Sequence, residues 1–172
     1  MQSIVDFFDQ LFTVLGYLTT LLVMLGAIYT IYLIAKGVIP VWIRLGMGLS
    51  KRKIAVFAEG DEFDSLKSTL VDSGIFLKSN VVKIDKNSLN KAEDMTLFLV
   101  HWNSFKSEID DILEKKKHYA AMVIYAPQSE GFIDEDTMEK INKRSNTTIV
   151  NFRGRLLNDI LVSMITTSYK TK

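Results

Sequence analysis

The 172-residue chain has no cysteine and little proline or histidine, and each shortage excludes a class of protein. Without cysteine there is no disulfide scaffold, no thiol nucleophile and no Cys-ligated zinc or iron–sulfur centre. Two histidines, His101 and His118, are too few for a multi-histidine metal centre. We therefore expect neither a metal site nor a cofactor. Nine glycines, two prolines and 10% aromatic residues also exclude fibrous, low-complexity and disordered chains.

The chain also has no marked excess of charge of either sign. The formal net charge of +1 gives no basis for binding duplex nucleic acid through a broad basic surface. The charges are unevenly distributed, however: residues 10–35 contain none, whereas residues 54–172 hold sixteen basic and eighteen acidic residues. The chain therefore divides into an apolar N-terminal part and a charged C-terminal part.

The uncharged run predicts a transmembrane helix, which we place within residues 1–36. As a helix, residues 10–35 would measure about 39 Å, longer than a hydrocarbon core of about 30 Å. A buried helix of a soluble protein rarely runs this long without a polar face. A cleaved signal peptide fits poorly, because no Lys or Arg precedes the apolar run.

The flanks of this helix predict its orientation. Only Asp6 and Asp9 are charged before the run, whereas residues 36–53 carry five basic residues and no acid. The positive-inside rule then places the N-terminus outside a bacterial inner membrane and the C-terminal part in the cytoplasm, with a single pass. Within residues 37–53, Gly37 and Pro40 are expected to bend or end the helix. The apolar stretch that follows is compatible with a segment lying on the membrane surface and with a kinked extension of the first helix.

A stripe of small or weakly polar residues runs along one face of the predicted span. Starting from Asp9, it recurs at steps of three or four residues through Thr13, Gly16, Thr20, Val23, Ala27 and Thr30. Such faces pack helices closely or line a narrow pore. Because one helix cannot enclose a pore, conduction would require an oligomer, and simple helix packing remains the alternative.

The charged part alternates between short apolar runs and helical patterns. The predicted strands are 54–58, 81–84, 96–100, 120–126 and 147–152, and the predicted helices are 61–73, 86–94, 104–117, 134–144 and 155–169. This alternation predicts an α/β fold with a parallel sheet and right-handed crossovers. For residues 54–172 we expect a five-stranded, flavodoxin-like or Rossmann-like domain with strand order 2-1-3-4-5 and the short strand 81–84 at an edge.

In such a sheet, ligands bind beyond the carboxyl ends of the strands. The loop there with the most specific indication of a ligand is Arg153-Gly154-Arg155, with Asn158 one turn into the next helix. Its guanidinium groups and free N–H groups could bind an anion. The alternative is that both arginines are solvated or pair with acids of the first loop.

Two further loops supply candidate ligand-binding residues. Trp102, beside His101 and Asn103, would suit stacking on a base, with the amide reading its edge. The alternative is a tryptophan packed on the following helix. Gln128 follows the fourth strand and completes the predicted set.

Enzymatic interpretations have less support. No GxGxxG or Walker motif follows the first strand, neither histidine lies near a GxSxG elbow, and a phospho-acceptor aspartate is missing after the third strand. A lone catalytic Glu59 is the remaining enzymatic option. We therefore assign no catalytic residue.

The predicted compact domain directly follows a membrane segment. Its loops at the expected ligand-binding edge contain the stretches FAEGDEFD, LVHWNSF, YAPQSEGF and NFRGRLLND. This layout resembles the small membrane effectors of prokaryotic antiphage defence, such as CARF-domain membrane effectors and the channel effector of Hailong-type systems. The resemblance implies a homo-oligomer, with a tetramer favoured, whose pore is controlled by a nucleotide or oligonucleotide made by a partner nucleotidyltransferase or polymerase. A membrane-tethered scaffold that docks a partner protein is the alternative.

Overall fold

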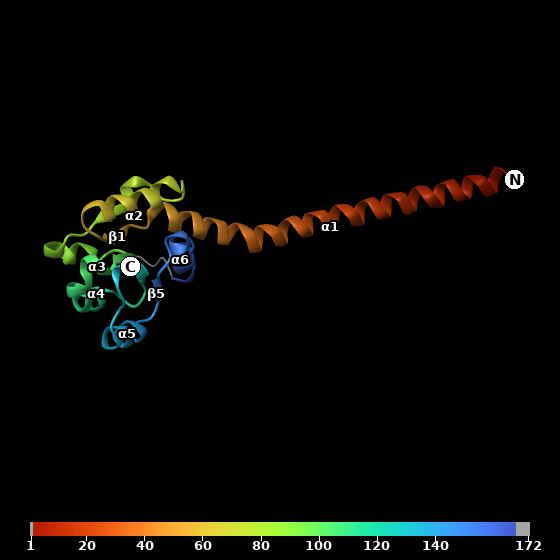
Figure 1. The fold of residues 1–172 in the computed structure, drawn as a ribbon. Helices are drawn as coiled ribbons and strands as arrows, with labels where there is room; N and C mark the ends of the chain where they lie inside the picture. Colours follow the sequence, from red (N-terminus) through yellow and green to blue (C-terminus); the bar gives the residue numbers. More distant parts are fainter. Residues whose placement is uncertain (1, 168–172) are drawn as a thin grey trace. The chain divides into compact units, whose positions relative to one another are not determined.

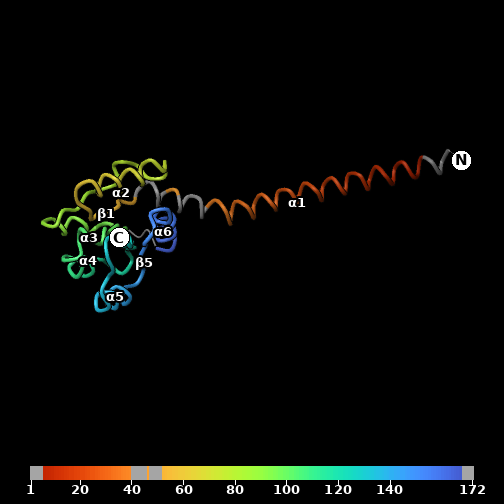
Figure 2. The backbone as a smooth tube through the Cα atoms, viewed as in Figure 1, coloured from red at the N-terminus to blue at the C-terminus, as the bar shows by residue number. Residues whose placement is uncertain are grey.

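The computed structural model describes residues 2–167, with side-chain burial described for residues 6–39 and 52–167. The chain forms two compact units, Met1–Arg44 and Leu45–Lys172. The first unit lies within one long helix and the second is an α/β domain. Figure 2 traces the described path of the backbone.

The first helix, α1 (Gln2–Lys51), is long and apolar enough to cross a membrane. The stretch Asp6–Ile39 has a mean hydropathy of 2.1, and no residue of its most apolar window is buried. Helical backbone continues through Gly37 and Pro40, so of the two expected alternatives the helix does not end there and an extension of the first helix is present. A proline removes only one helical hydrogen bond, which a helix of 50 residues can absorb. Residues 37–51 therefore extend the first helix.

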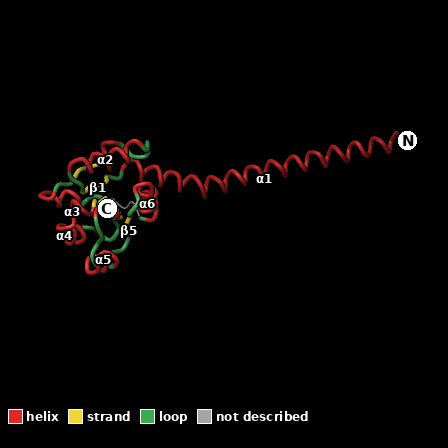
Figure 3. Tube along the Cα trace, in the orientation of Figure 1, coloured by secondary structure: helices red, strands yellow, loops and turns green. Residues whose placement is uncertain are grey.

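The domain contains a five-stranded parallel sheet with strand order β2-β1-β3-β4-β5, as predicted. Its strands are β1 (Ile54–Phe57), β2 (Val81–Lys83), β3 (Leu97–His101), β4 (Ala121–Tyr125) and β5 (Thr147–Val150). The register aligns Val56 of β1 with Leu99 of β3, and His101 of β3 with Tyr125 of β4. Figure 3 shows these strands among the helices that connect them.

The connecting helices are mostly those that the periodicity predicts. The α-helices are α2 (Gly60–Asp72), α3 (Trp102–Phe105), α4 (Ile109–Lys115), α5 (Glu135–Asn142) and α6 (Arg153–Thr166). The 3-10 segments are η1 (Lys78–Asn80), η2 (Lys86–Ala92), η3 (Lys106–Glu108) and η4 (Gln128–Glu130). The predicted helix 86–94 is thus a 3-10 segment, kinked where Ser88 leaves helical backbone angles. The predicted helix 104–117 is divided among α3, η3 and α4.

Two hydrophobic clusters cover the two faces of the sheet. In the first cluster, α2 and α6 contribute Leu66 and Ile160 against residues of β1, β3 and β4. In the second, η2, α3, α4 and α5 pack against the other face. In Figure 1, α3 and α4 accordingly lie on the left of the domain and α6 on its right. Every residue of β1, β3 and β4 is buried, because helices exclude water from both faces.

Candidate functional site

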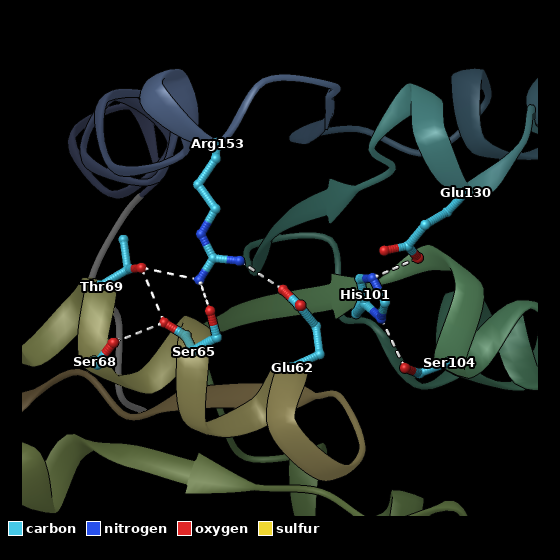
Figure 4. A network of polar contacts seen from close by, with 8 residues as sticks. All are labelled: Glu62, Ser65, Ser68, Thr69, His101, Ser104, Glu130 and Arg153. Carbon is cyan, nitrogen blue, oxygen red and sulfur yellow. Dashed lines mark hydrogen bonds and ion pairs between the residues drawn. The ribbon is translucent and has the colours of Figure 1, made fainter.

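The predicted ligand-binding residues lie in the loops and helix starts that follow β3, β4 and β5, at the carboxyl edge of the sheet. Figure 4 shows the polar contacts at this edge: one group joins α6 to α2, and the other joins β3 to α3 and η4. The network contains two groups, one centred on Arg153 and one on His101. Both groups contact the ring of Tyr125, the last residue of β4.

The guanidinium of Arg153 is already partnered within the domain. Its Nη1 lies 2.7 Å from Glu62 Oε1, and its Nη2 donates to Ser65 Oγ at 2.6 Å and to Thr69 Oγ1 at 3.1 Å. The group also lies over the Tyr125 ring, 5.6 Å from its centroid. Arg153 thus clamps the start of α6 to α2. The sequence left two roles open for Arg153, binding an anion and pairing with an acid that follows the first strand. In the structure Arg153 pairs with such an acid, Glu62.

Arg155 differs from Arg153 in its environment. Its side chain is 70% exposed, and its ion pair with Asp159 is long at 3.8 Å. Gly154 has open space where a Cβ would stand, and the exposed Asn158 amide donates to Asp159 Oδ1 at 3.4 Å. This first turn of α6 contains no acid, and its helix dipole favours an anion. Arg155 is therefore available to a negatively charged ligand.

Trp102 does not present its indole to solvent. It is 6% exposed and belongs to the second hydrophobic cluster, together with Phe105 of the same short helix. Of the two expected roles of Trp102, stacking on a base and packing within the domain, packing is the one present, because its ring contributes to the core. Its neighbour Asn103 is exposed, as a ligand contact requires.

His101 is buried between a hydroxyl and a carboxylate. Its Nδ1 lies 2.7 Å from Ser104 Oγ, and its Nε2 lies 2.9 Å from Glu130 Oε2. His101 is 4% exposed, so its main effect is to hold the loop that contains Glu130 against the end of β3.

Gln128 lines a cleft that the sequence does not reveal. The cleft has a volume of about 310 Å³ and lies where β4 and β5 end against α5. Its other lining residues are Ala126, Gly131, Phe132, Ile133, Met138, Ile149 and Asn151. Gly131 has a φ of +102° and a ψ of 178°, a backbone region that is essentially restricted to glycine.

Arg52 is a second residue that sequence reasoning missed. It immediately follows α1, and its side chain is 2% exposed. Its Nη1 donates to Met164 O and to Thr167 Oγ1, both at 3.0 Å, and its Nη2 donates to Thr167 O. Arg52 thus caps the carboxyl end of α6, where a cation is favoured by the helix dipole. Because Arg52 lies in a basic run, the sequence suggests only membrane-facing charge there.

Two neighbouring lysines at the end of α4 have opposite environments. Lys116 is 6% exposed and donates to Ser145 O at 2.7 Å. Its burial, with a smaller effect of the Arg144 charge, lowers the pKa of Lys116. In contrast, hydrogen bonding to Asp94 raises the pKa of the exposed Lys117. Neither lysine lies at the carboxyl edge of the sheet; Lys116 packs within the domain and Lys117 forms an exposed ion pair with Asp94.

The described acidic and histidine side chains bear on the metal and catalytic-acid options. Among the described residues, no group of three or more acidic or histidine side chains is arranged to hold a metal ion. Glu59, at the start of α2, is exposed and lies 3.8 Å from Lys86 Nζ.

The stripe on α1 consists of exposed residues whose hydroxyl groups are satisfied within the helix. Thr13, Thr20 and Thr30 donate to carbonyl oxygens four residues earlier, at 2.7, 2.8 and 2.8 Å respectively. Hydroxyls that are satisfied in this way can face either lipid or another helix. The geometry of α1 is therefore compatible with helix packing and with pore lining.

No protein-family model, curated protein or solved structure matches the chain.

Proposed function

We propose that the chain is a membrane-embedded signal receptor, in which the α/β domain binds a nucleotide or oligonucleotide and thereby controls a pore formed by α1 in a homo-oligomer. In this proposal the protein sits in a bacterial inner membrane with its N-terminus outside, and serves antiphage defence. A partner enzyme supplies the signal.

The observation that carries the proposal is the position of α6. Its first turn contains Arg153 and Arg155 at the carboxyl edge of the sheet, where ligands of parallel α/β sheets bind. Its last turn is capped by Arg52, the residue that follows α1 in the chain. One helix of 14 residues therefore connects the candidate binding edge with the residue directly after α1.

This connection supports control of α1 by a ligand. A ligand that contacts the first turn of α6 in one arrangement of the domain and not in another shifts the balance between the two arrangements. A displacement of α6 would act on Arg52, because the guanidinium holds three acceptors at the end of that helix. The ligand can open the pore or hold it shut, since either sign follows from differential affinity.

Two membrane-potential measurements test this function. Bacteria that express the full chain are compared, by a voltage-sensitive dye, with bacteria that express residues 51–172. Depolarisation by the full chain alone supports a conducting span that is open without a signal. In the second, nucleotides are supplied by a co-expressed nucleotidyltransferase, and a potential that changes only with the full chain supports a pore that the signal controls.

The scaffold alternative makes a different prediction for the same assay. If α1 only tethers the domain, replacing residues 6–39 by an unrelated apolar helix of equal length preserves function. If α1 conducts, the replacement abolishes the change in membrane potential while leaving the domain folded. Identical behaviour of the native and replaced helices would overturn the pore proposal.

A further inference from the structure

We propose that the cleft between β4, β5 and α5 is a nucleobase-binding pocket, with Phe132 as its stacking residue and Gln128 and Asn151 as its edge-reading amides. The inference rests on the proposed function in that it takes the ligand to be a nucleotide. In this inference Phe132 supplies the aromatic stacking that the sequence suggested for Trp102, which is buried.

The size and lining of the cleft suit a single ring system. Its volume of about 310 Å³ lies at the lower end of the range of about 300–1,000 Å³ for small-molecule sites. Ala126, Ile133, Met138 and Ile149 supply an apolar wall. Gln128 and Asn151 add polar groups, so the pocket combines an apolar surface with a few orienting contacts.

Phe132 is an exposed aromatic residue without an evident structural role. Its side chain is 87% exposed, although it follows directly on the cleft-lining Gly131. A planar base in the cleft would cover the phenyl ring and remove apolar surface from water. Stacking of this kind is insensitive to base identity, because every base has a π-face.

The backbone beside Phe132 turns at Gly131 and is anchored at Glu130. Gly131 has φ at +102°, a conformation that glycine adopts without strain and that other residues rarely take. One residue earlier, Glu130 Oε2 lies 2.9 Å from His101 Nε2 and anchors the loop to β3. The loop is thus fixed at Glu130 and turned at Gly131.

The two amides give the pocket its hydrogen-bonding character. Each carries a donor and an acceptor side by side, which matches the adjacent donor and acceptor on the edge of a nucleobase. Asn151 precedes Phe152, the N-cap of α6, and lies two residues from Arg153 and four from Arg155. In this proposal the phosphate of a nucleotide whose base lies in the cleft contacts the exposed guanidinium of Arg155.

Equilibrium dialysis of the purified full-length chain in detergent tests the pocket, with AMP, GMP, CMP, UMP and inorganic phosphate as probes. We expect at least one mononucleotide to bind, its nucleoside to compete, and inorganic phosphate to compete poorly. Phe132→Ala should weaken binding about tenfold or more, and Gln128→Met about three- to tenfold. Tyr119→Ala is the matched control, because this exposed aromatic residue precedes β4 at the opposite edge of the sheet.

Three results would overturn the pocket. They are an absence of mononucleotide binding, competition by phosphate as strong as that by the nucleotide, and equal binding by the wild type, Phe132→Ala and Gln128→Met. In the third case, nucleotide binding that is lost in Arg155→Ala would leave the proposed function standing and remove only the pocket. The membrane-potential assay decides the proposed function independently.

Discussion

Arg52 and Thr167 are joined by two hydrogen bonds, from the guanidinium of Arg52 to the hydroxyl and to the backbone carbonyl of Thr167. The two residues are 115 positions apart in the chain, and both side chains are buried. The contact ties the start of the domain to the end of its last helix. It is the link on which communication between the domain and the membrane segment depends in our proposal.

Replacing Arg52 by methionine should destabilise the domain by about 3 kcal/mol, because the buried carbonyl groups at the end of α6 would lose a charged donor. Urea unfolding of the full chain in detergent, followed by tryptophan fluorescence, measures this loss. Lys53→Met is the matched control, since Lys53 is exposed and its loss should change the unfolding free energy by less than about 0.5 kcal/mol. Equal effects of the two substitutions would contradict the role assigned to Arg52.

We expect Arg153 to contribute to stability and Arg155 to contact the ligand. Arg153→Ala should lower the unfolding free energy by about 1–2 kcal/mol, because Glu62, Ser65 and Thr69 lose their shared partner. Arg155→Ala should leave stability within about 0.5 kcal/mol and weaken binding of a nucleotide probe. Thermal unfolding and equilibrium dialysis on the same two variants measure both quantities. A stable Arg153→Ala variant would show that the clamp contributes little.

Trp102 and Asn103 give a comparison of the same kind within the third loop. Trp102→Ala should cost about 3–5 kcal/mol, because it removes a large buried ring from the second hydrophobic cluster. Asn103→Ala should be close to neutral, since its side chain is exposed. Urea midpoints of the two variants measure the difference. A Trp102→Ala variant that folds with wild-type stability would contradict the core role of Trp102 and favour a ligand contact instead.

Lys116 and Lys117 should influence the pH dependence of stability in opposite directions. Burial lowers the pKa of Lys116, so its unfavourable contribution is present at neutral pH and is relieved as the pH rises towards its unfolded value of 10.5. The hydrogen bond to Asp94 raises the pKa of Lys117, so its favourable contribution is present below 10.5 and is lost above it.

Methionine substitutions separate these two contributions. Lys116→Met should reduce the gain in stability as the pH approaches 10.5, whereas Lys117→Met should reduce the loss above it. Chemical unfolding at a series of alkaline pH values measures both slopes against the wild type. Slopes that change in the same direction for both variants would contradict the assigned environments.

Much of the fold could be predicted because hydrophobic patterning acts locally. The apolar runs of β1, β3 and β4 are buried on both faces, and the regular alternation of strands and helices predicts the parallel order correctly. The segment 86–94 was harder to predict, because a single kink at Ser88 changes the helix type without changing the apolar pattern.

The candidate site was harder to predict from the sequence, because contacts between residues far apart in the chain decide which side chains remain free to bind a ligand. Arg153 and Arg155 are equivalent in the sequence, yet only Arg153 meets Glu62, a residue 91 positions away. Trp102 follows a strand in the manner of a ligand contact, but the fold turns its ring into the core. The positive φ of Gly131 and the exposure of Phe132 likewise appear only in three dimensions.

Ion flux through liposomes that contain the purified full chain is the most direct test of control by the domain over α1. Flux is recorded with and without the mononucleotide that binds most tightly, for the wild type, for Arg52→Met and for a chain with an unrelated apolar helix in place of residues 6–39. We predict a flux that the nucleotide changes in the wild type, a reduced response in Arg52→Met and no flux with the replaced helix. Equal flux from all three proteins, with and without nucleotide, would contradict the account.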